Sequence, residues 1–305
     1  LVNDKTDYPD GIQVRDLPPD PDGTRAFSNP RNKTGSARQF SGRVDGRWGI
    51  TSFSGLAVHG SVRKAPDTVQ EIKEPVLPPG PATGNILHRI FEEVDFQASD
   101  VTETVERVFQ QYRFNDRTGE RKDTVVRMVR NVLDARLENS RGFMSLSRVP
   151  VRDRIAELEF YLNAEKIDAR CLRELTGAPA VSTDLLSGCI HGYIDLVFRH
   201  GGLFYLLDWK SNYLGGSVAD YTPERMREVM REHDYVLQYY IYTLALARHL
   251  STALAGYEYE KHFGGVYYIF LRGVGTRPET PGGVYFDRPP KENIDRLLTM
   301  LDGAS

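Results

Sequence analysis

Cysteine is scarce in this chain of 305 residues, which contains only Cys171 and Cys189. Two thiols are too few for a four-thiolate iron–sulfur cluster. We expect them to be buried apolar residues in a reduced compartment rather than a disulfide. No stretch approaches the ~18 apolar residues of a membrane span, and no signal-peptide pattern opens the chain. These absences predict a cytoplasmic protein with no membrane segment.

An excess of positive charge is also missing. Lys and Arg number 39 against 42 Asp and Glu, which gives a formal net charge of −3. Because duplex affinity comes largely from neutralised phosphates, this balance argues against strong DNA binding by the chain alone. No G-x-x-x-x-G-K-[S/T] phosphate loop occurs, so we expect any ATP-driven motor to lie outside this chain.

The first 80 residues differ in composition from the rest. Residues 4–30 are rich in Pro, Asp, Gly and Asn, and residues 31–47 are basic. This composition predicts a partly irregular linker over 1–80 and a globular domain over 81–305. We interpret the basic residues as a solvated charged linker, with DNA contact as the alternative. The chain begins at Leu1 without a methionine, so we expect a piece of a longer polypeptide.

Two predicted strands carry the most informative residues. Ile190–Arg199 and Leu203–Lys210 are β-branched and aromatic runs, and the His200-Gly-Gly connection between them predicts a hairpin. Pairing the two strands brings Asp195 into the neighbourhood of Asp208.

Asp208 and Lys210 project from one face of their strand, while Trp209 points away. Carboxylate oxygens favour Mg²⁺, which polarises a phosphoryl oxygen and lowers the pKa of a bound water. A nearby lysine can hold or help deprotonate that water. An exposed hairpin with a weak ion pair is the alternative. Leu203–Leu207 reads as a buried strand, where an unpaired charge is costly, so the pattern favours phosphodiester hydrolysis.

A long predicted helix follows these strands. Thr222-Pro223 is a start signal, and an apolar pattern continues to Leu250. Gln238 and Tyr242 lie at i and i+4, hence on one face of this helix. Core packing by Tyr242, with a local hydrogen bond from Gln238, is the alternative to a role in a functional site.

These motifs occur in a familiar order. G-x-x-D over Gly192–Asp195, D-x-K over Asp208–Lys210 and Q-x-x-x-Y over Gln238–Tyr242 together resemble the PD-(D/E)xK nuclease superfamily. With His262–Val266, they resemble more narrowly the C-terminal nuclease domain of the RecB family, part of the RecBCD helicase-nuclease, exodeoxyribonuclease V. The likeness runs from about Pro81 to the C-terminus. It implies an α/β fold with a restriction-endonuclease-like core, a mixed central β-sheet flanked by helices.

The resemblance also implies further site residues. Asn85–Glu92 resembles the first core helix of the family, which implies that His88 is a metal ligand. Ile155–Leu162 resembles its first core strand, which implies that Glu159 lies beside the metal. Glu157 shares a face with Glu159 by the period of two, so the residues alone do not choose between them. The implied metal ligands are His88, Asp195, Asp208 and the backbone carbonyl of Trp209, and the implied catalytic residues are Asp195, Asp208, Lys210, Glu159, Gln238 and Tyr242.

The implied function is a Mg²⁺-dependent DNA nuclease, with Mn²⁺ as a substitute and Ca²⁺ as an inhibitor. Its substrate would be single-stranded DNA from unwound duplex during double-strand break repair and recombination. The implied partners are a helicase core in the same parent polypeptide and RecC-like and RecD-like subunits, in the bacterial cytoplasm. Residues 48–54 resemble the short ordered piece that follows the RecB helicase core. A non-catalytic nuclease-like scaffold is the alternative, and the retention of both carboxylates and the lysine argues against it.

Apolar periodicity predicts the remaining elements. Helices are predicted near 84–94, 101–113, 121–140, 223–250 and 291–302, and strands near 154–162, 190–199, 203–210 and 264–272.

Overall fold

The computed structural model describes residues 50–52, 76–139, 141–178, 181, 188–276 and 282–303. Most of the predicted linker, residues 1–49 and 53–75, lies outside the described residues, including its basic part. Ile50–Thr51, within the segment expected to be ordered, forms the short strand β1 and pairs in parallel with β5.

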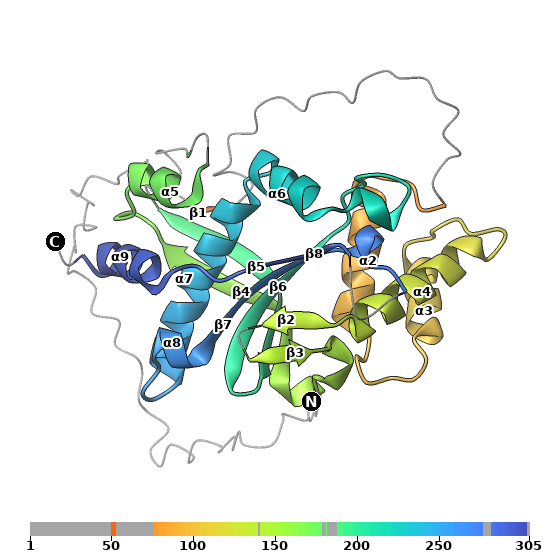
Figure 1. Ribbon diagram of the computed structural model, residues 1–305, viewed down its shortest axis with the longest axis horizontal. Coiled ribbons are helices and arrows are strands. Elements are labelled where there is room, and N and C mark those ends of the chain that lie inside the picture. The colour runs from red at the N-terminus through yellow and green to blue at the C-terminus, as the bar shows by residue number, and fades with distance from the viewer. Residues whose placement is uncertain are drawn as a thin grey trace, which may run out of the picture. The chain divides into compact units, whose positions relative to one another are not determined.

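Six described strands form one mixed sheet in the order β1-β5-β6-β7-β8, and β4 also pairs with β5 (Figure 1). The longer strands are β4 (Arg154–Asn163), β5 (Cys189–His200), β6 (Leu203–Lys210), β7 (Phe263–Phe270) and β8 (Val284–Asp287). β6 and β7 run parallel, whereas β4–β5, β5–β6 and β7–β8 are antiparallel. The mixed sheet flanked by helices confirms the predicted fold class.

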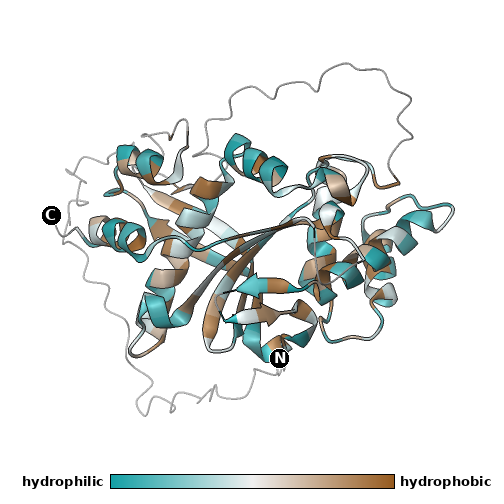
Figure 2. Cartoon of the chain, viewed as in Figure 1, coloured by the Kyte–Doolittle hydropathy of each residue, from teal (hydrophilic) through white to brown (hydrophobic). Residues whose placement is uncertain are grey.

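Helices cover both faces of the sheet (Figure 1). The first face carries α2 (Pro81–Glu93), α3 (Thr102–Gln111) and α4 (Glu120–Asp134), and the second carries α5 (Ala169–Thr176), α6 (Pro223–Glu232), α7 (Tyr235–Ala253) and α9 (Lys291–Asp302). We call the two apolar layers beneath them the α2 core and the α7 core. Figure 2 shows hydrophilic residues on the outer turns of α5, α6 and α9. No described helix combines the length and apolarity needed to cross a bilayer.

Several element boundaries differ from the prediction. The helix predicted over 223–250 is broken into α6 and α7 because Asp234 adopts a left-handed conformation, with φ of 55°. The helix predicted over 121–140 ends at Asp134, and a hairpin of β2 (Leu137–Asn139) and β3 (Gly142–Met144) follows. The coarse pattern also missed α5, β8 and the one-turn helix α8 (Tyr259–His262).

A paired irregularity interrupts β4 and β5 at one point. Glu157 has a φ of 50° and lies opposite Asp195, and these two residues make no ladder pair although the pairs on both sides form. Along β5, Ile194 packs in the α7 core and Leu196 packs in the α2 core, although both have even numbers. The side-chain alternation therefore reverses where Asp195 and Glu157 face each other.

The Trp209 side chain packs helix α2 against the sheet. Its side chain is buried in the α2 core, and its ring stacks on Phe91 with centroids 4.3 Å apart. Phe91 lies one turn after His88, so this contact holds the histidine above the end of β6. We expect Trp209→Ala to lower the free energy of unfolding by about 3–5 kcal/mol, through lost burial and the cavity left behind. Urea unfolding would measure this loss, and Trp209→Phe, which keeps a stacked ring, should cost less.

Candidate active site

Asp208 and Lys210 form a buried ion pair at the end of β6. They are 4% and 8% exposed, and Lys210 Nζ lies 2.6 Å from Asp208 Oδ1. That oxygen has no hydrogen bond of ordinary geometry among the described residues. Burial, followed by repulsion from Asp195, outweighs the attraction of Lys210 and raises the pKa of Asp208 to about 6. The carboxylate is therefore short of positive charge even beside the lysine.

Helix α7 holds Lys210 in place. Gln238 Oε1 accepts hydrogen bonds from Lys210 Nζ at 3.0 Å and from the Tyr268 hydroxyl at 2.8 Å. Gln238 Nε2 donates to the Tyr242 hydroxyl at 3.0 Å, and Lys210 Nζ lies 3.7 Å from the centroid of the Tyr235 ring. The structure thus brings the predicted Gln238 and Tyr242 together with the lysine. Sequence reasoning missed Tyr268, because a tyrosine in an apolar strand carries no signal beyond core packing.

His88 and Asp195 meet beside this pair. His88 Nδ1 lies 3.3 Å from Asp195 Oδ2, and the same oxygen accepts a hydrogen bond from the Trp209 N–H at 2.8 Å. Burial lowers the pKa of His88, but Asp195 and Asp208 together raise it further, so the net shift is upward. The backbone of Trp209 is fixed next to Asp195 through its N–H, while its carbonyl stays a predicted ligand.

The two glutamates of β4 lie in different surroundings. Glu157 lines the same pocket as His88 and Asp195, and burial followed by the charges of Asp195 and Glu92 raises its pKa. The structure does not bring Glu159 to this pocket. Its exposed carboxylate instead accepts hydrogen bonds from neighbouring aromatic side chains. The positive φ of Glu157 separates two residues that the period of two treats as equivalent.

Packing favours a glycine at position 192, the first residue of the G-x-x-D motif. A Cβ atom at this position would lie 3.0 Å from the ring of Phe160, its partner on β4. That ring packs edge-on against Tyr242 at 5.6 Å. The absence of a side chain at Gly192 therefore leaves room for the contact that seats α7 against β4 and β5.

The pocket above these residues is acidic and has a volume of about 680 Å³. Its charged lining residues are Glu92, Glu157 and Asp195, together with His88 and with Arg89, which pairs with Glu92. The pKa values of His88, Glu157 and Asp208 are all raised, so the folded protein holds protons here more tightly than an unfolded chain. No three of the described metal-binding side chains already surround one point at ligand distances. Oxygen and imidazole donors that favour added positive charge nevertheless fit a divalent cation.

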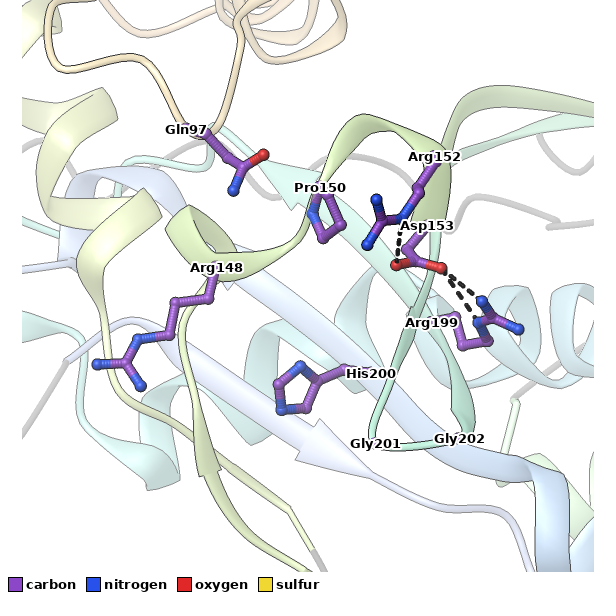
Figure 3. Close-up of a pocket in the computed structure, with 9 residues that line it drawn as sticks. All are labelled: Gln97, Arg148, Pro150, Arg152, Asp153, Arg199, His200, Gly201 and Gly202. Carbon is purple, nitrogen blue, oxygen red and sulfur yellow. Dashed lines mark hydrogen bonds and ion pairs between the residues drawn. The ribbon is translucent and has the colours of Figure 1, made fainter.

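A second cavity, of about 650 Å³, lies at the turn of the β5–β6 hairpin (Figure 3). Figure 3 shows Arg152 and Arg199 converging on Asp153, and Arg199 Nη2 donates to its carboxylate at 2.7 Å. Arg199 lies four residues from Asp195 along β5, or about 13 Å at ~3.3 Å per residue. The only carboxylate of its lining is already paired with arginine. Of the two cavities, the acidic pocket therefore has the donor groups that better fit a metal ion.

Comparison with known proteins agrees with this geometry. The profile of the PD-(D/E)XK nuclease superfamily matches residues 61–302. The RecBCD enzyme subunit RecB of Escherichia coli K12 is 37% identical over 282 residues, covering 85% of this chain and 23% of that protein. The subunit of the same name from Haemophilus influenzae is 32% identical over 312 residues, covering 90% and 25%. The chain thus spans about a quarter of the length of these relatives. The profile match includes all the acidic-pocket residues described above.

Proposed function

Because this chain belongs to the PD-(D/E)XK nuclease superfamily, we propose that it is a Mg²⁺-dependent deoxyribonuclease domain that hydrolyses DNA phosphodiester bonds. The observation that carries this proposal is the buried Asp208–Lys210 pair beside Asp195 and His88. Two carboxylates supply hard oxygen donors for the cation, an imidazole supplies a nitrogen donor, and the buried lysine supplies a fixed positive charge.

Asp195, Asp208 and His88 would hold the metal, with the backbone carbonyl of Trp209 as a fourth ligand. The bound ion would polarise the scissile phosphate and lower the pKa of the attacking water. The charge of the cation would offset the repulsion between Asp208 and Asp195 that raises the pKa of Asp208.

Lys210 would position that water by donating a hydrogen bond to its oxygen. Its amine is oriented by Gln238 and by the Tyr235 ring, so little motion is needed when charge develops on the phosphate. Glu157, which lines the pocket, would take the role of the acidic residue beside the metal that the family resemblance suggested for Glu159. Gln238 and Tyr242 act through Lys210 as positioning residues.

Metal exchange tests this function. With single-stranded DNA, we expect cleavage in Mg²⁺ or Mn²⁺, and a loss of about tenfold or more when Ca²⁺ replaces Mg²⁺, because Ca²⁺ accepts a looser coordination geometry. Ca²⁺ added to a Mg²⁺ reaction should inhibit by competition. Cleavage that continues at an undiminished rate in EDTA would contradict the proposal.

We further propose that DNA reaches this domain from a motor. The relatives are named as subunits of the RecBCD enzyme, and a net charge of −3 gives the chain little affinity of its own for DNA. In this proposal a helicase core of the parent polypeptide and RecC-like and RecD-like subunits feed it single strands during recombination repair. Such an assembly would work in the bacterial cytoplasm, where chromosomal DNA lies.

Delivery predicts different rates for the chain alone and for the parent assembly. The chain alone should cut single-stranded DNA slowly and lose activity steeply as salt rises. A motor that feeds a tethered domain raises the local DNA concentration to about the millimolar range, so the assembly should cut orders of magnitude faster and require ATP. Equal rates across a salt titration would show that the domain captures DNA by itself.

A further inference from the structure

A group of exposed aromatic side chains adjoins the acidic pocket. Tyr161 of β4 and Tyr193 of β5 are 61% and 47% exposed, and His191 lies between them. We call these three rings, together with Glu159, the Glu159 cluster. Large aromatic side chains gathered on a soluble surface are typical of a binding site rather than of the fold.

Glu159 holds the three rings in a fixed arrangement. Its Oε1 accepts from His191 Nε2 at 2.9 Å and from the hydroxyls of Tyr161 and Tyr193 at 3.1 Å each. The Tyr161 and His191 rings are stacked at 4.5 Å and 16°, and Tyr193 meets His191 edge-on at 5.3 Å. These hydrogen bonds, that from His191 first, lower the pKa of Glu159, so the carboxylate stays charged. Rings fixed in this way lose little further entropy when a ligand binds.

The cluster continues the pocket along the same two strands. Glu159 pairs with Tyr193 and Tyr161 pairs with His191, directly beyond the point where Glu157 faces Asp195. At ~3.3 Å per residue, these two pairs lie about 7 Å and 13 Å from Asp195. A stacked DNA strand rises ~3.4 Å per nucleotide, so the cluster faces nucleotides roughly two to four steps from the scissile phosphate.

We propose that the Glu159 cluster binds the unpaired bases of the DNA strand that is being cut, by stacking on Tyr161 and Tyr193. This inference rests on the proposed nuclease function. Each base–aromatic stack contributes about 1–3 kcal/mol and tolerates any sequence. Duplex bases already stack on one another and cannot offer their faces, so the subsite selects single strands.

Charge favours bases over phosphates as the bound groups. The cluster carries the Glu159 carboxylate and no lysine or arginine, so a phosphate placed on it would be repelled. An uncharged aromatic ring has no such penalty. The bases therefore face the sheet at this subsite, and the phosphates face solvent.

The double variant Tyr161→Ala/Tyr193→Ala tests the subsite in the whole chain. Kd for a single-stranded oligonucleotide, measured by fluorescence anisotropy in Ca²⁺, should rise at least about tenfold, and KM in Mg²⁺ should rise in parallel while kcat changes little. Tyr161→Phe/Tyr193→Phe, which keeps the rings, should lose less. Phe143→Ala removes an aromatic ring that is 53% exposed on β3 and serves as the matched control.

An abasic substrate separates stacking from a structural effect. Removing the bases two to four nucleotides from the scissile phosphate should weaken binding to the wild type about as much as the double alanine variant does. The same removal should have little further effect on that variant. Equal losses from base removal in both proteins would overturn the proposed subsite. Unchanged single-strand binding by the variant would also overturn it and would favour a protein-binding surface instead. Anisotropy measures binding and needs no cleavage. A chain that fails to cleave DNA would therefore refute the proposed nuclease function, while the binding test of the subsite could still be carried out.

Discussion

Neutralising either member of the Asp208–Lys210 pair should reduce DNA cleavage by at least about a thousandfold. Asp208→Asn removes a proposed metal ligand, and Lys210→Met removes the buried positive charge next to it. Each group acts on charge that develops at the phosphate in a buried site, where the loss of such an interaction costs several kcal/mol of the activation barrier. Single-turnover cleavage of single-stranded DNA in Mg²⁺ would measure this loss.

The free energies of unfolding of these variants should rank differently from their cleavage rates. Lys210→Met leaves Asp208 buried near Asp195 without a counter-charge and should cost about 3 kcal/mol in metal-free buffer at pH 8. Asp208→Asn should cost less, because Lys210 keeps its hydrogen bond to Gln238 and its contact with the Tyr235 ring. The double variant removes both charges, so its unfolding free energy should approach that of the wild type while cleavage stays lost.

Comparing the two single variants with the double variant separates the effect on catalysis from the effect on folding. An inactive but stable double variant would show that the charges are needed for chemistry and not for the fold. Cleavage within tenfold of the wild-type rate by any of the three variants would contradict the assignment of the site.

The part of the site that follows regular periodicity was predictable from the sequence. Asp208 and Lys210 project together because β6 alternates without interruption, and Trp209 enters the α2 core on the other face. Gln238 and Tyr242 share a helix face for the same kind of reason, and their hydrogen bond to each other confirms that they are neighbours.

Local backbone conformations set the limit of that prediction. The left-handed conformation of Asp234 divides the predicted helix in two, and although Asp is among the residues that tolerate this conformation, its presence does not require a break. The left-handed conformation of Glu157 interrupts the side-chain alternation along β4. A rule of period two therefore cannot tell which of the two glutamates enters the pocket. Such conformations are costly for residues with side chains, and they persist at sites where they place a functional group.

The two glutamates of β4 therefore predict two kinds of kinetic defect. Glu157→Gln should lower kcat by about a hundredfold or more, because it removes negative charge from the pocket that we propose to hold the metal. Glu159→Gln should mainly raise KM, because an amide accepts weaker hydrogen bonds from the rings that it orients. Glu165→Gln, an exposed change in the loop after β4, is the control for lost charge alone.

Manganese provides a further distinction between these variants. A defect in metal binding at Glu157 should be partly relieved by Mn²⁺, which binds more tightly than Mg²⁺ to sites that contain an imidazole. A defect in base stacking through Glu159 should not respond to the metal, and it should vanish with the abasic substrate. If Glu159→Gln were the variant that loses kcat and recovers in Mn²⁺, the acidic residue beside the metal would be Glu159. The conformation of β4 would then have to change when the metal binds.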